Sequence, residues 1–410
     1  MREFLVVAGW LKPEMKIGIC EIESARGRET ISFRYDEEWL KKHPNLVIDP
    51  DIISMEVRQY PPEGKQCFGF LSDTAPDRWG RMLMKRRESA DAADEKRPVR
   101  TLMESDYILG VHDAGRIGGL RFMSTNDNNY YSDRDTLAAP PMEKLRELES
   151  AVSKLELGEG DMRKWLKNLL DPGSSLGGAR PKANVLDEQG AIWIAKFPSR
   201  HDEIDVGAWE MVAHNLSLRC GIKVPEAKAM KLSKTGTTFL TRRFDRDEKM
   251  RVHYASAMTM LGKNDGEQAG YIDIADAIEQ IGCKPVEDLK ELWKRMVFNI
   301  CISNTDDHLR NHGFLLSVKG WRLSPAFDIN PNIEKTHMDL VIGDSNNKSI
   351  KEAQDIADFF RIDKKESLDI IGRIQKMIRE FWKYEADSNG IPTKEQNIMK
   401  DAFEKAYSSI

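Results

Sequence analysis

The segment NTDDHLRN at residues 304–311 follows an apolar helical stretch and concentrates chemically active side chains. It contains the acid Asp306, the imidazole His308 and the amide Asn311, and a second acid, Asp328, follows a predicted β-hairpin. One carboxylate can accept the proton of an attacking hydroxyl, while an amide oxygen and a second carboxylate can hold Mg²⁺ against nucleotide phosphates. The residue types and their order therefore predict phosphoryl transfer, with Asp306 as the base and Asn311 and Asp328 as the metal ligands.

The spacing of these residues supports the same chemistry. In the protein-kinase pattern H-R-D-L-x-x-x-N the asparagine lies five positions after the aspartate, and Asn311 lies five positions after Asp306. The tripeptide Asp-Ile-Asn at 328–330 stands where kinases have Asp-Phe-Gly. A zinc site at His308 and His312 is disfavoured, because the H-E-x-x-H pattern needs a glutamate where Leu309 stands. We expect His308 to brace the catalytic loop.

A glycine-containing stretch, SSLGGARPK at residues 174–182, precedes two strand-like segments. Glycines such as Gly177 and Gly178 let backbone N–H groups converge on an anion, and Arg180 or Lys182 would add positive charge. The stretch matches neither G-x-x-x-x-G-K-[ST] nor G-x-G-x-x-G, so on local grounds phosphate binding and an ordinary loop both remain open.

Lys196 ends an apolar stripe on the second of those strand-like segments. In AIWIAKF, strand alternation places Ile192, Ile194 and Lys196 on one face. Such a face can contact a nucleotide base while the ammonium meets phosphate, although a lysine at a strand end that extends into solvent is equally consistent with the pattern. Glu210, on the predicted helix 203–219, is a candidate partner that would hold Lys196 in place.

Regular elements are expected on both sides of the polar segment. Apolar residues recur every three or four positions across 286–301, which predicts a helix anchored in a core. The runs FLLSV and WRLS predict a hairpin around Lys319-Gly320 that brings Asp328 back toward Asp306 and Asn311. The remaining expected elements are a strand in TISFRY, a helix from Pro76 to about 97, two strands around a DEQG turn, and helices at about 351–361, 365–385 and 393–407.

Composition limits the class of protein. The chain has 410 residues, 40% apolar and 31% charged residues and a net charge of -5, without the global basic excess of a nucleic-acid binder. This length predicts two or three folding units. The five scattered cysteines contain no C-x-x-C pair, and the first apolar run is too short for a membrane span. We therefore expect a cytoplasmic protein with reduced thiols and no membrane partner.

Several of these segments together resemble the HipA family, the serine/threonine kinase half of bacterial type II toxin–antitoxin pairs. The resemblance extends over nearly the whole chain. It is carried by DTAPDRWGR (73–81), SSLGGARPK (174–182), IAKFP (194–198), TRRFDR (241–246), NTDDHLRN (304–311) and FDINP (327–331). It implies an α+β fold, with a small N-terminal α+β subdomain fused to a bilobal protein-kinase-like body whose C-terminal lobe is mostly helical. The implied domains are 1–105 for the N-terminal subdomain, 106–245 for the kinase N-lobe and 246–410 for the helical C-lobe.

The resemblance also implies roles for individual residues, with ATP and Mg²⁺ as cofactors. Asp306 and His308 would be catalytic, and Asn311 and Asp328 would bind the metal. The implied nucleotide-binding residues are Ser175, Gly177, Gly178, Ala179 and Lys182 of the phosphate loop, Lys196, Arg242 and Phe244 of the hinge, and Asn311. Ser175 is the implied regulatory phosphorylation site, with Ser174 beside it as the alternative.

The implied partners are a protein substrate, a small helix-turn-helix (HipB-like) antitoxin and, through that antitoxin, operator DNA. The family's targets include aminoacyl-tRNA synthetases. RVHYASAMTMLG at 251–262 departs from the acidic stretch of the founding family type, so contacts from that region are not carried over. Two other functions remain open at this point: a small-molecule or phosphoinositide kinase, and a co-repressor that acts mainly by binding an antitoxin on DNA.

Overall fold

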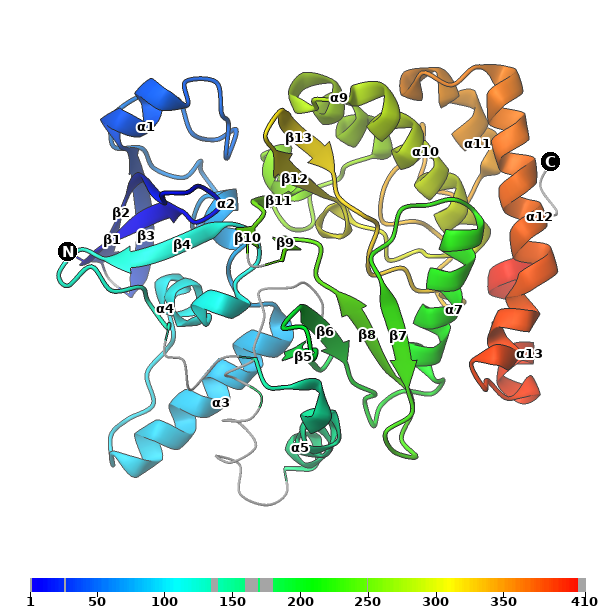
Figure 1. Ribbon diagram of the computed structural model, residues 1–410, viewed down its shortest axis with the longest axis horizontal. Coiled ribbons are helices and arrows are strands. Elements are labelled where there is room, and N and C mark those ends of the chain that lie inside the picture. The colour runs from blue at the N-terminus through cyan, green and yellow to red at the C-terminus, as the bar shows by residue number, and fades with distance from the viewer. Residues whose placement is uncertain are drawn as a thin grey trace. The chain divides into compact units, whose positions relative to one another are not determined.

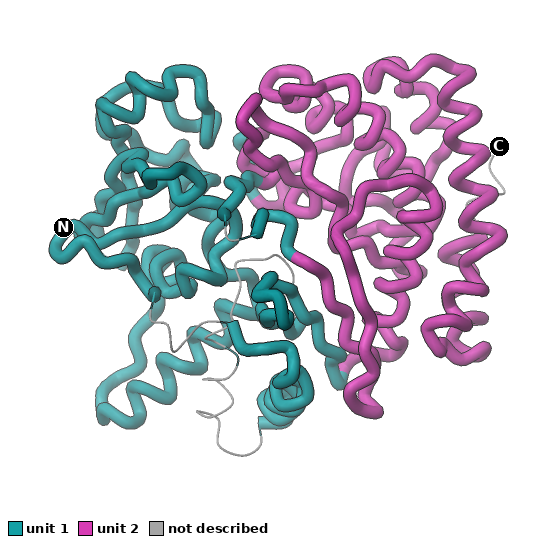
Figure 2. Tube along the Cα trace, in the orientation of Figure 1, with its two compact units in different colours: residues 1–200, 243–255, 262–264 teal, residues 201–242, 256–261, 265–410 magenta. Residues whose placement is uncertain are grey.

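The computed structural model mixes helices and sheets, as expected from the sequence (Figure 1). It describes residues 2–25, 27–133, 139–158, 169, 180–248 and 250–404. The chain divides into two compact units, coloured separately in Figure 2. Unit 1 contains residues 1–200, 243–255 and 262–264, and unit 2 contains residues 201–242, 256–261 and 265–410. The domain boundaries at 105 and 245 stay predictions.

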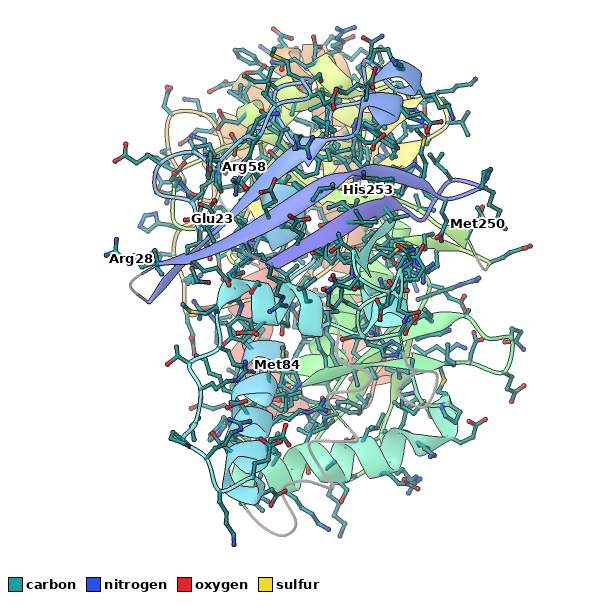
Figure 3. All side chains as sticks on the ribbon, turned by 90° about the vertical axis from the view of Figure 1, so that its left-hand side faces the viewer. Glu23, Arg28, Arg58, Met84, Met250 and His253 are labelled. Atoms are coloured by element: carbon teal, nitrogen blue, oxygen red, sulfur yellow. The ribbon has the colours of Figure 1, made fainter. Side chains whose placement is uncertain are left out.

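Unit 1 begins with a four-stranded antiparallel sheet in the order β3-β2-β1-β4. Its strands are β1 (Arg2–Ala8), β2 (Met15–Ala25), β3 (Arg28–Tyr35) and β4 (Leu120–Ser124). β3 contains the strand predicted in TISFRY, and its inward residues Ile31 and Phe33 are fully buried. On β2, Glu23 pairs with Arg58 at 2.7 Å (Figure 3). The period-two pattern of TISFRY therefore places apolar side chains of β3 in the core beneath this sheet.

Helices and a hairpin complete unit 1. Asp77 caps the long helix α3 by accepting a hydrogen bond from the backbone N–H of Gly80, close to the start predicted at Pro76. The DEQG turn joins β5 and β6 into an antiparallel hairpin, as predicted. The other elements of unit 1 are α1 (Glu37–Lys42), α2 (Gly69–Ser72), α3 (Arg78–Asp94), α4 (Glu104–Gly110), α5 (Leu145–Leu157), β5 (Lys182–Leu186), β6 (Ile192–Lys196), β9 (Arg246–Asp247) and β10 (Met250–Arg251), with short 3-10 turns η1 (Asp113–Gly115) and η3 (Met142–Lys144).

Unit 2 is mostly helical, and its long helix α12 packs against α7 and α10 (Figure 1). The helices are α7 (Val206–Arg219), α8 (Ala257–Met260), α9 (Tyr271–Ile281), α10 (Pro285–Cys301), α11 (Ile350–Asp355), α12 (Lys364–Ser388) and α13 (Thr393–Glu404). The strands and 3-10 turns are β7 (Ala227–Met230), β8 (Thr238–Arg242), β12 (Gly313–Ser317), β13 (Gly320–Leu323), η4 (Leu309–Asn311) and η5 (Ala357–Phe360), and β11 (Tyr254–Ser256) crosses the boundary between the units. The predicted helix 286–301, the hairpin around Lys319-Gly320 and the three C-terminal helical regions are confirmed.

The state of the cysteines and the character of the helices complete the description of the fold. All five cysteines are free thiols, and Cys20, Cys67 and Cys301 are buried. Among the described residues, no helix combines the length and the apolar character that crossing a membrane would need.

Candidate active site

Helix α10 of unit 2 directly precedes the polar segment at residues 304–311 and fixes where that segment begins. Pro285 occupies the first turn of this helix, where its missing N–H costs nothing, and Leu289, Trp293 and Met296 are fully buried. The helix ends at Cys301, and the backbone reverses at Ser303, which has a φ of 54°. Residues 303–308 therefore start from a rigid support although they form no regular element themselves.

The buried side chain of Asp307 anchors residues 303–308 in the core of unit 2. Its carboxylate is 2% exposed and accepts hydrogen bonds from the Tyr271 hydroxyl, from Asn299 Nδ2 at 2.9 Å and from His312 Nε2 at 2.9 Å. An ionised carboxylate can only accept, so His312 Nε2 must carry the proton. Burial alone would raise the pKa of Asp307, but the His312 imidazole and the Tyr271 hydroxyl hold that pKa below its usual value. Asp307 is thus an ionised buried anchor.

Asp306, the neighbouring acid, has the opposite environment. Its side chain is 62% exposed, and Oδ1 accepts a hydrogen bond from Lys335 Nζ at 2.8 Å. The backbone carbonyl of Asp306 accepts a hydrogen bond from Asn311 Nδ2 at 3.0 Å. One acid of the pair is therefore locked in the core, and the other presents its carboxylate to solvent, where a substrate can reach it.

The segment that carries Asp328 lies against residues 303–304, at the start of the predicted catalytic segment (residues 304–311). Asn304 connects them: its Nδ2 donates to Asn299 Oδ1 at 3.2 Å, and its Oδ1 accepts from the backbone N–H of Asn330 at 3.3 Å. The backbone N–H of Asn332 also donates to the carbonyl of Ser303 at 3.0 Å. The predicted return of the chain after the hairpin therefore brings residues 330–332 alongside residues 303–304.

Asp328 and Asn311 have the chemistry that Mg²⁺ requires. Asp328 has a φ of 56°, a left-handed conformation that aspartate and asparagine adopt more readily than most residues, and its Oδ1 accepts from Asn330 Nδ2 at 3.2 Å. Asn311 uses Nδ2 on the Asp306 carbonyl, which leaves the amide oxygen as the atom available to a cation. A carboxylate and an amide oxygen are hard ligands of the kind that Mg²⁺ prefers beside nucleotide phosphates. These two residues fit the metal that the sequence predicts.

His308 and His312 have different contacts in the structure. The His308 ring is half-buried, and its carbonyl accepts a hydrogen bond from the backbone N–H of Asn311 at 2.8 Å, at the start of η4. The imidazole that contacts the buried acid belongs to His312. His308 thus helps to place Asn311 through its main chain, and a catalytic role for its ring stays a prediction.

The lysines predicted to meet phosphates lie in unit 1. Lys196 ends β6 and is half-buried, and its strand partner in the β5–β6 register is Lys182. Lys182 is 3% exposed, and its Nζ lies 2.8 Å from Asp77 Oδ2, the N-cap acid of α3. Burial raises the pKa of Asp77, although the Lys182 ammonium opposes this effect. Lys182 therefore ties the hairpin to α3.

Other predicted residues lie outside the described part of the chain or belong to different units. Ser174, Ser175, Gly177, Gly178 and Ala179 lie outside the described residues. Glu210 is 4% exposed on α7 in unit 2, whereas Lys196 belongs to unit 1, so their pairing stays a prediction.

The predicted hinge, residues 241–246, crosses from one unit to the other between Arg242 and Arg243. Arg242 is exposed at the end of β8, and its backbone N–H donates to the carbonyl of Glu226 at 2.8 Å. Phe244 is half-buried, and its ring centroid lies 6.2 Å from that of Tyr254. The adenine contacts assigned to Arg242 and Phe244 stay predictions.

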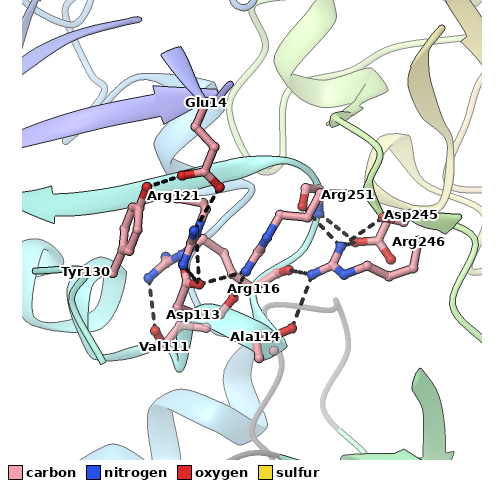
Figure 4. Close-up of polar contacts among 12 residues, drawn as sticks. Glu14, Val111, Asp113, Ala114, Arg116, Arg121, Tyr130, Asp245, Arg246 and Arg251 are labelled. Atoms are coloured by element: carbon pink, nitrogen blue, oxygen red, sulfur yellow. Dashed lines mark hydrogen bonds and ion pairs between the residues drawn. The ribbon is translucent and has the colours of Figure 1, made fainter. Parts of the chain in front are cut away.

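A buried charge network fixes the part of the hinge that belongs to unit 1 (Figure 4). Asp245 accepts from Arg243 Nε at 2.8 Å, from Arg246 Nη1 at 2.8 Å and from the backbone N–H of Gly118 at 2.6 Å. Burial would raise the pKa of Asp245, but the two guanidinium groups hold it far below its usual value. The hinge backbone after Arg242 is therefore attached to the loop that contains Gly118.

The same network continues toward the N-terminal sheet. Asp113 accepts from Arg121 Nη2 at 2.7 Å and from Arg251 Nη2 at 2.8 Å, and Arg121 Nη1 also donates to Glu14 at 2.8 Å (Figure 4). Arg116, fully buried, donates to the backbone carbonyls of Ile108 and Val111. This arrangement connects β4 and the loop after α4 with residues 243–251.

Sequence reasoning missed the residues that support the site. For Asn299 a signal exists, because a polar amide three positions after Met296 interrupts the apolar stripe of α10. Tyr271 and Lys335 carry no local signal, since each meets the site through a contact between segments distant in sequence.

Two family models match the chain. The model of the HipA-like C-terminal domain covers residues 174–382, just over half of the chain, and the model of the HipA N-terminal domain covers residues 13–104. This chain belongs to the HipA family. The C-terminal match contains NTDDHLRN (304–311) and FDINP (327–331), two of the segments on which the resemblance to the HipA family was based.

One solved structure supports the fold of this HipA chain, and a second is similar over a shorter stretch. The HipA protein of a Shewanella oneidensis MR-1 toxin–antitoxin complex with HipB and operator DNA superposes with a TM-score of 0.63 at 15% identity, over 98% of this chain and 95% of that one. The Helicobacter pylori proinflammatory kinase CtkA gives a TM-score of 0.41 at 16% identity, over 57% of this chain and 90% of that one. No curated protein sequence matches this chain significantly. The α+β class expected for a HipA protein is confirmed.

Proposed function

We propose that this HipA-family chain is an ATP- and Mg²⁺-dependent protein serine/threonine kinase. The observation that carries the proposal is the opposite environment of two adjacent acids: Asp307 is buried with three hydrogen-bond donors, while Asp306 is 62% exposed. A packed core needs no exposed carboxylate held on such an anchor, whereas a general base needs both a fixed backbone and access to substrate.

The reaction assigns one task to each side chain. The acceptor hydroxyl oxygen bonds to the γ-phosphorus of ATP, and its proton passes to Asp306. The bond from the γ-phosphorus to the β–γ bridging oxygen breaks, and ADP departs with that electron pair. Asn311 and Asp328 would hold Mg²⁺, which supplies positive charge to the phosphate oxygens when bound. Positioning and electrostatics account for most of the catalysis in this type of transfer.

The other parts of the proposal rest on the family. Lys196 would contact the ATP phosphates, residues 242–244 would hold the adenine, and His308 would support the catalytic loop. Autophosphorylation at Ser175 would add about two negative charges beside the ATP phosphates and so silence the enzyme. A cytoplasmic protein substrate is proposed, with aminoacyl-tRNA synthetases as the first candidates.

An antitoxin is the proposed protein partner. The Shewanella HipA structure contains HipB and operator DNA, and a net charge of -5 makes this chain a poor direct ligand for DNA. A small basic helix-turn-helix protein would therefore make the DNA contacts. Gel-shift assays with operator DNA test this: the chain should shift DNA only when the antitoxin is present, and a shift by the chain alone would contradict it.

Phosphate transfer itself is tested with γ-labelled ATP. The parent chain should label itself and a protein in a bacterial lysate, located by mass spectrometry, and Asp306→Asn should lower the rate by about a hundredfold or more. Asp265→Asn is the matched control, since Asp265 is also exposed and paired with an arginine, Arg310, at 3.0 Å; it should behave like the parent. Transfer to a small molecule or lipid head group, with no labelled protein, would contradict the protein-kinase proposal.

A further inference from the structure

Lys335 contacts the proposed base, although it comes from a loop that follows Asp328. Its Nζ donates to Asp306 Oδ1 at 2.8 Å and to Asp339 Oδ2 at 3.1 Å. Its side chain is 44% exposed, and those of Asp306 and Asp339 are 62% and 37% exposed. The proximity to Asp306 and Asp339 raises the pKa of Lys335, so the ammonium is charged at neutral pH. The contact is thus a charge-assisted hydrogen bond on one oxygen of Asp306.

The loop that carries Lys335 is attached to the catalytic segment on both sides of this residue. Before it, the backbone N–H of Asn332 donates to the carbonyl of Ser303 at 3.0 Å, and Asn332 Oδ1 caps the turn by accepting from the N–H of Glu334 at 2.7 Å. After it, the backbone N–H of Asp339 donates to the carbonyl of Thr305 at 3.0 Å. The ammonium is therefore presented to Asp306 by a frame built on the residues just before Asp306.

We propose that Lys335 is a positioning residue that holds Asp306 Oδ1 and so turns the other carboxylate oxygen toward the acceptor hydroxyl. This inference rests on the proposed kinase function. An exposed carboxylate otherwise rotates freely, and a misplacement of about 1 Å in a reacting group can cost about a hundredfold in rate. Asp339 shares the ammonium and limits its movement.

A simpler role predicts different behaviour. If Lys335 only neutralised Asp339 as a surface ion pair, the pair would contribute at most about 1 kcal/mol to stability and nothing to catalysis. Any loss of rate in Lys335→Ala would then come from the unpaired Asp339, and removing Asp339 as well would restore the rate. If Lys335 acts on Asp306, removal of Asp339 restores nothing.

The test compares kcat and KM for ATP in the full chain, with label transfer to the chain itself and to dephosphorylated casein as readouts. Lys335→Ala should lower kcat by about ten- to a hundredfold with an unchanged KM, and Lys335→Arg should recover most of the rate because it keeps charge and reach. The double variant Lys335→Ala/Asp339→Ala should stay as slow as Lys335→Ala.

The matched control is Lys284→Ala. Lys284 is an exposed lysine paired with Glu287 at 3.0 Å, and its removal should leave kcat unchanged. A parent that transfers phosphate while Lys335→Ala keeps its rate, or while the double variant regains it, overturns the positioning role and leaves the kinase function standing. A parent that transfers no phosphate, or an Asp306→Asn variant as active as the parent, overturns the proposed function and the inference with it.

Discussion

The adjacent acids Asp306 and Asp307 should separate activity from stability when each is replaced by alanine. Asp307→Ala would remove the acceptor for the Tyr271 hydroxyl, Asn299 Nδ2 and His312 Nε2, all within a site where Asp307 is 2% exposed. A buried donor left without a partner costs about 1–3 kcal/mol, and loss of one member of a buried charged group typically costs about 3–5 kcal/mol in total. The free energy of unfolding should therefore fall by about 4 kcal/mol.

Asp306→Ala provides the control within the same dipeptide. Its carboxylate is 62% exposed and makes an ion pair with the exposed Lys335, so its loss should change the free energy of unfolding by less than about 1 kcal/mol. It should nevertheless abolish phosphate transfer. Asp307→Ala should lower activity only through loss of folded protein and displacement of the segment.

Thermal unfolding followed by circular dichroism measures the contrast. For a domain of this size, each kcal/mol shifts the Tm by about 2–4 °C, so Asp307→Ala should melt roughly 10 °C below the parent and Asp306→Ala within about 3 °C of it. Equal melting temperatures for the two variants would refute the assignment of Asp307 as the buried anchor and Asp306 as the exposed base.

Two further predictions concern the metal loop and the hinge network. Asp328→Asn should keep the left-handed backbone, since Asn tolerates the observed φ of 56°, and should leave the Tm unchanged, while calorimetry should detect loss of the Mg²⁺-dependent part of ADP binding; ADP affinity that still rises with Mg²⁺ would exclude Asp328 as a ligand. Asp245→Asn should lower the free energy of unfolding by about 3–5 kcal/mol at pH 7, because it leaves buried Arg243 and Arg246 without their anion. The pKa of Asp245 is lowered in the folded state, so the stability that its carboxylate contributes is complete above its unfolded pKa and is lost as the pH falls through its folded pKa. In urea unfolding, the difference in free energy between parent and variant should therefore be constant above about pH 5 and shrink only in stronger acid. A difference that grew with acidity would contradict this role of Asp245.

Local sequence patterns predicted the elements that carry the site. The apolar stripe of 286–301 predicted α10, and the turn at Lys319-Gly320 predicted the hairpin that returns the chain to the catalytic segment. These predictions succeeded because periodicity and turn chemistry are properties of neighbouring residues. The chain after this hairpin contacts residues 303–304 through Asn330 and Asn332, and the predicted closeness of Asp328 itself to Asp306 and Asn311 stays a prediction.

The contacts that make the site specific were not accessible from sequence. Nothing in DD at 306–307 indicates which acid is buried, because burial depends on Tyr271 and Asn299, which reach Asp307 from α9 and α10. Lys335 also contacts Asp306 only after the chain has folded back. Lys182 shows the converse case: a cation beside a glycine loop suggests a phosphate ligand, yet it is buried against Asp77.

The central claim is most directly tested by a crystal structure with a non-hydrolysable ATP analogue and Mn²⁺ in place of Mg²⁺. The kinase assignment predicts an anomalous peak bonded at about 2 Å to an Asp328 carboxylate oxygen and to the Asn311 amide oxygen, with the γ-phosphate facing Asp306. A metal that contacts neither residue, or a nucleotide bound away from Asp306, would contradict it.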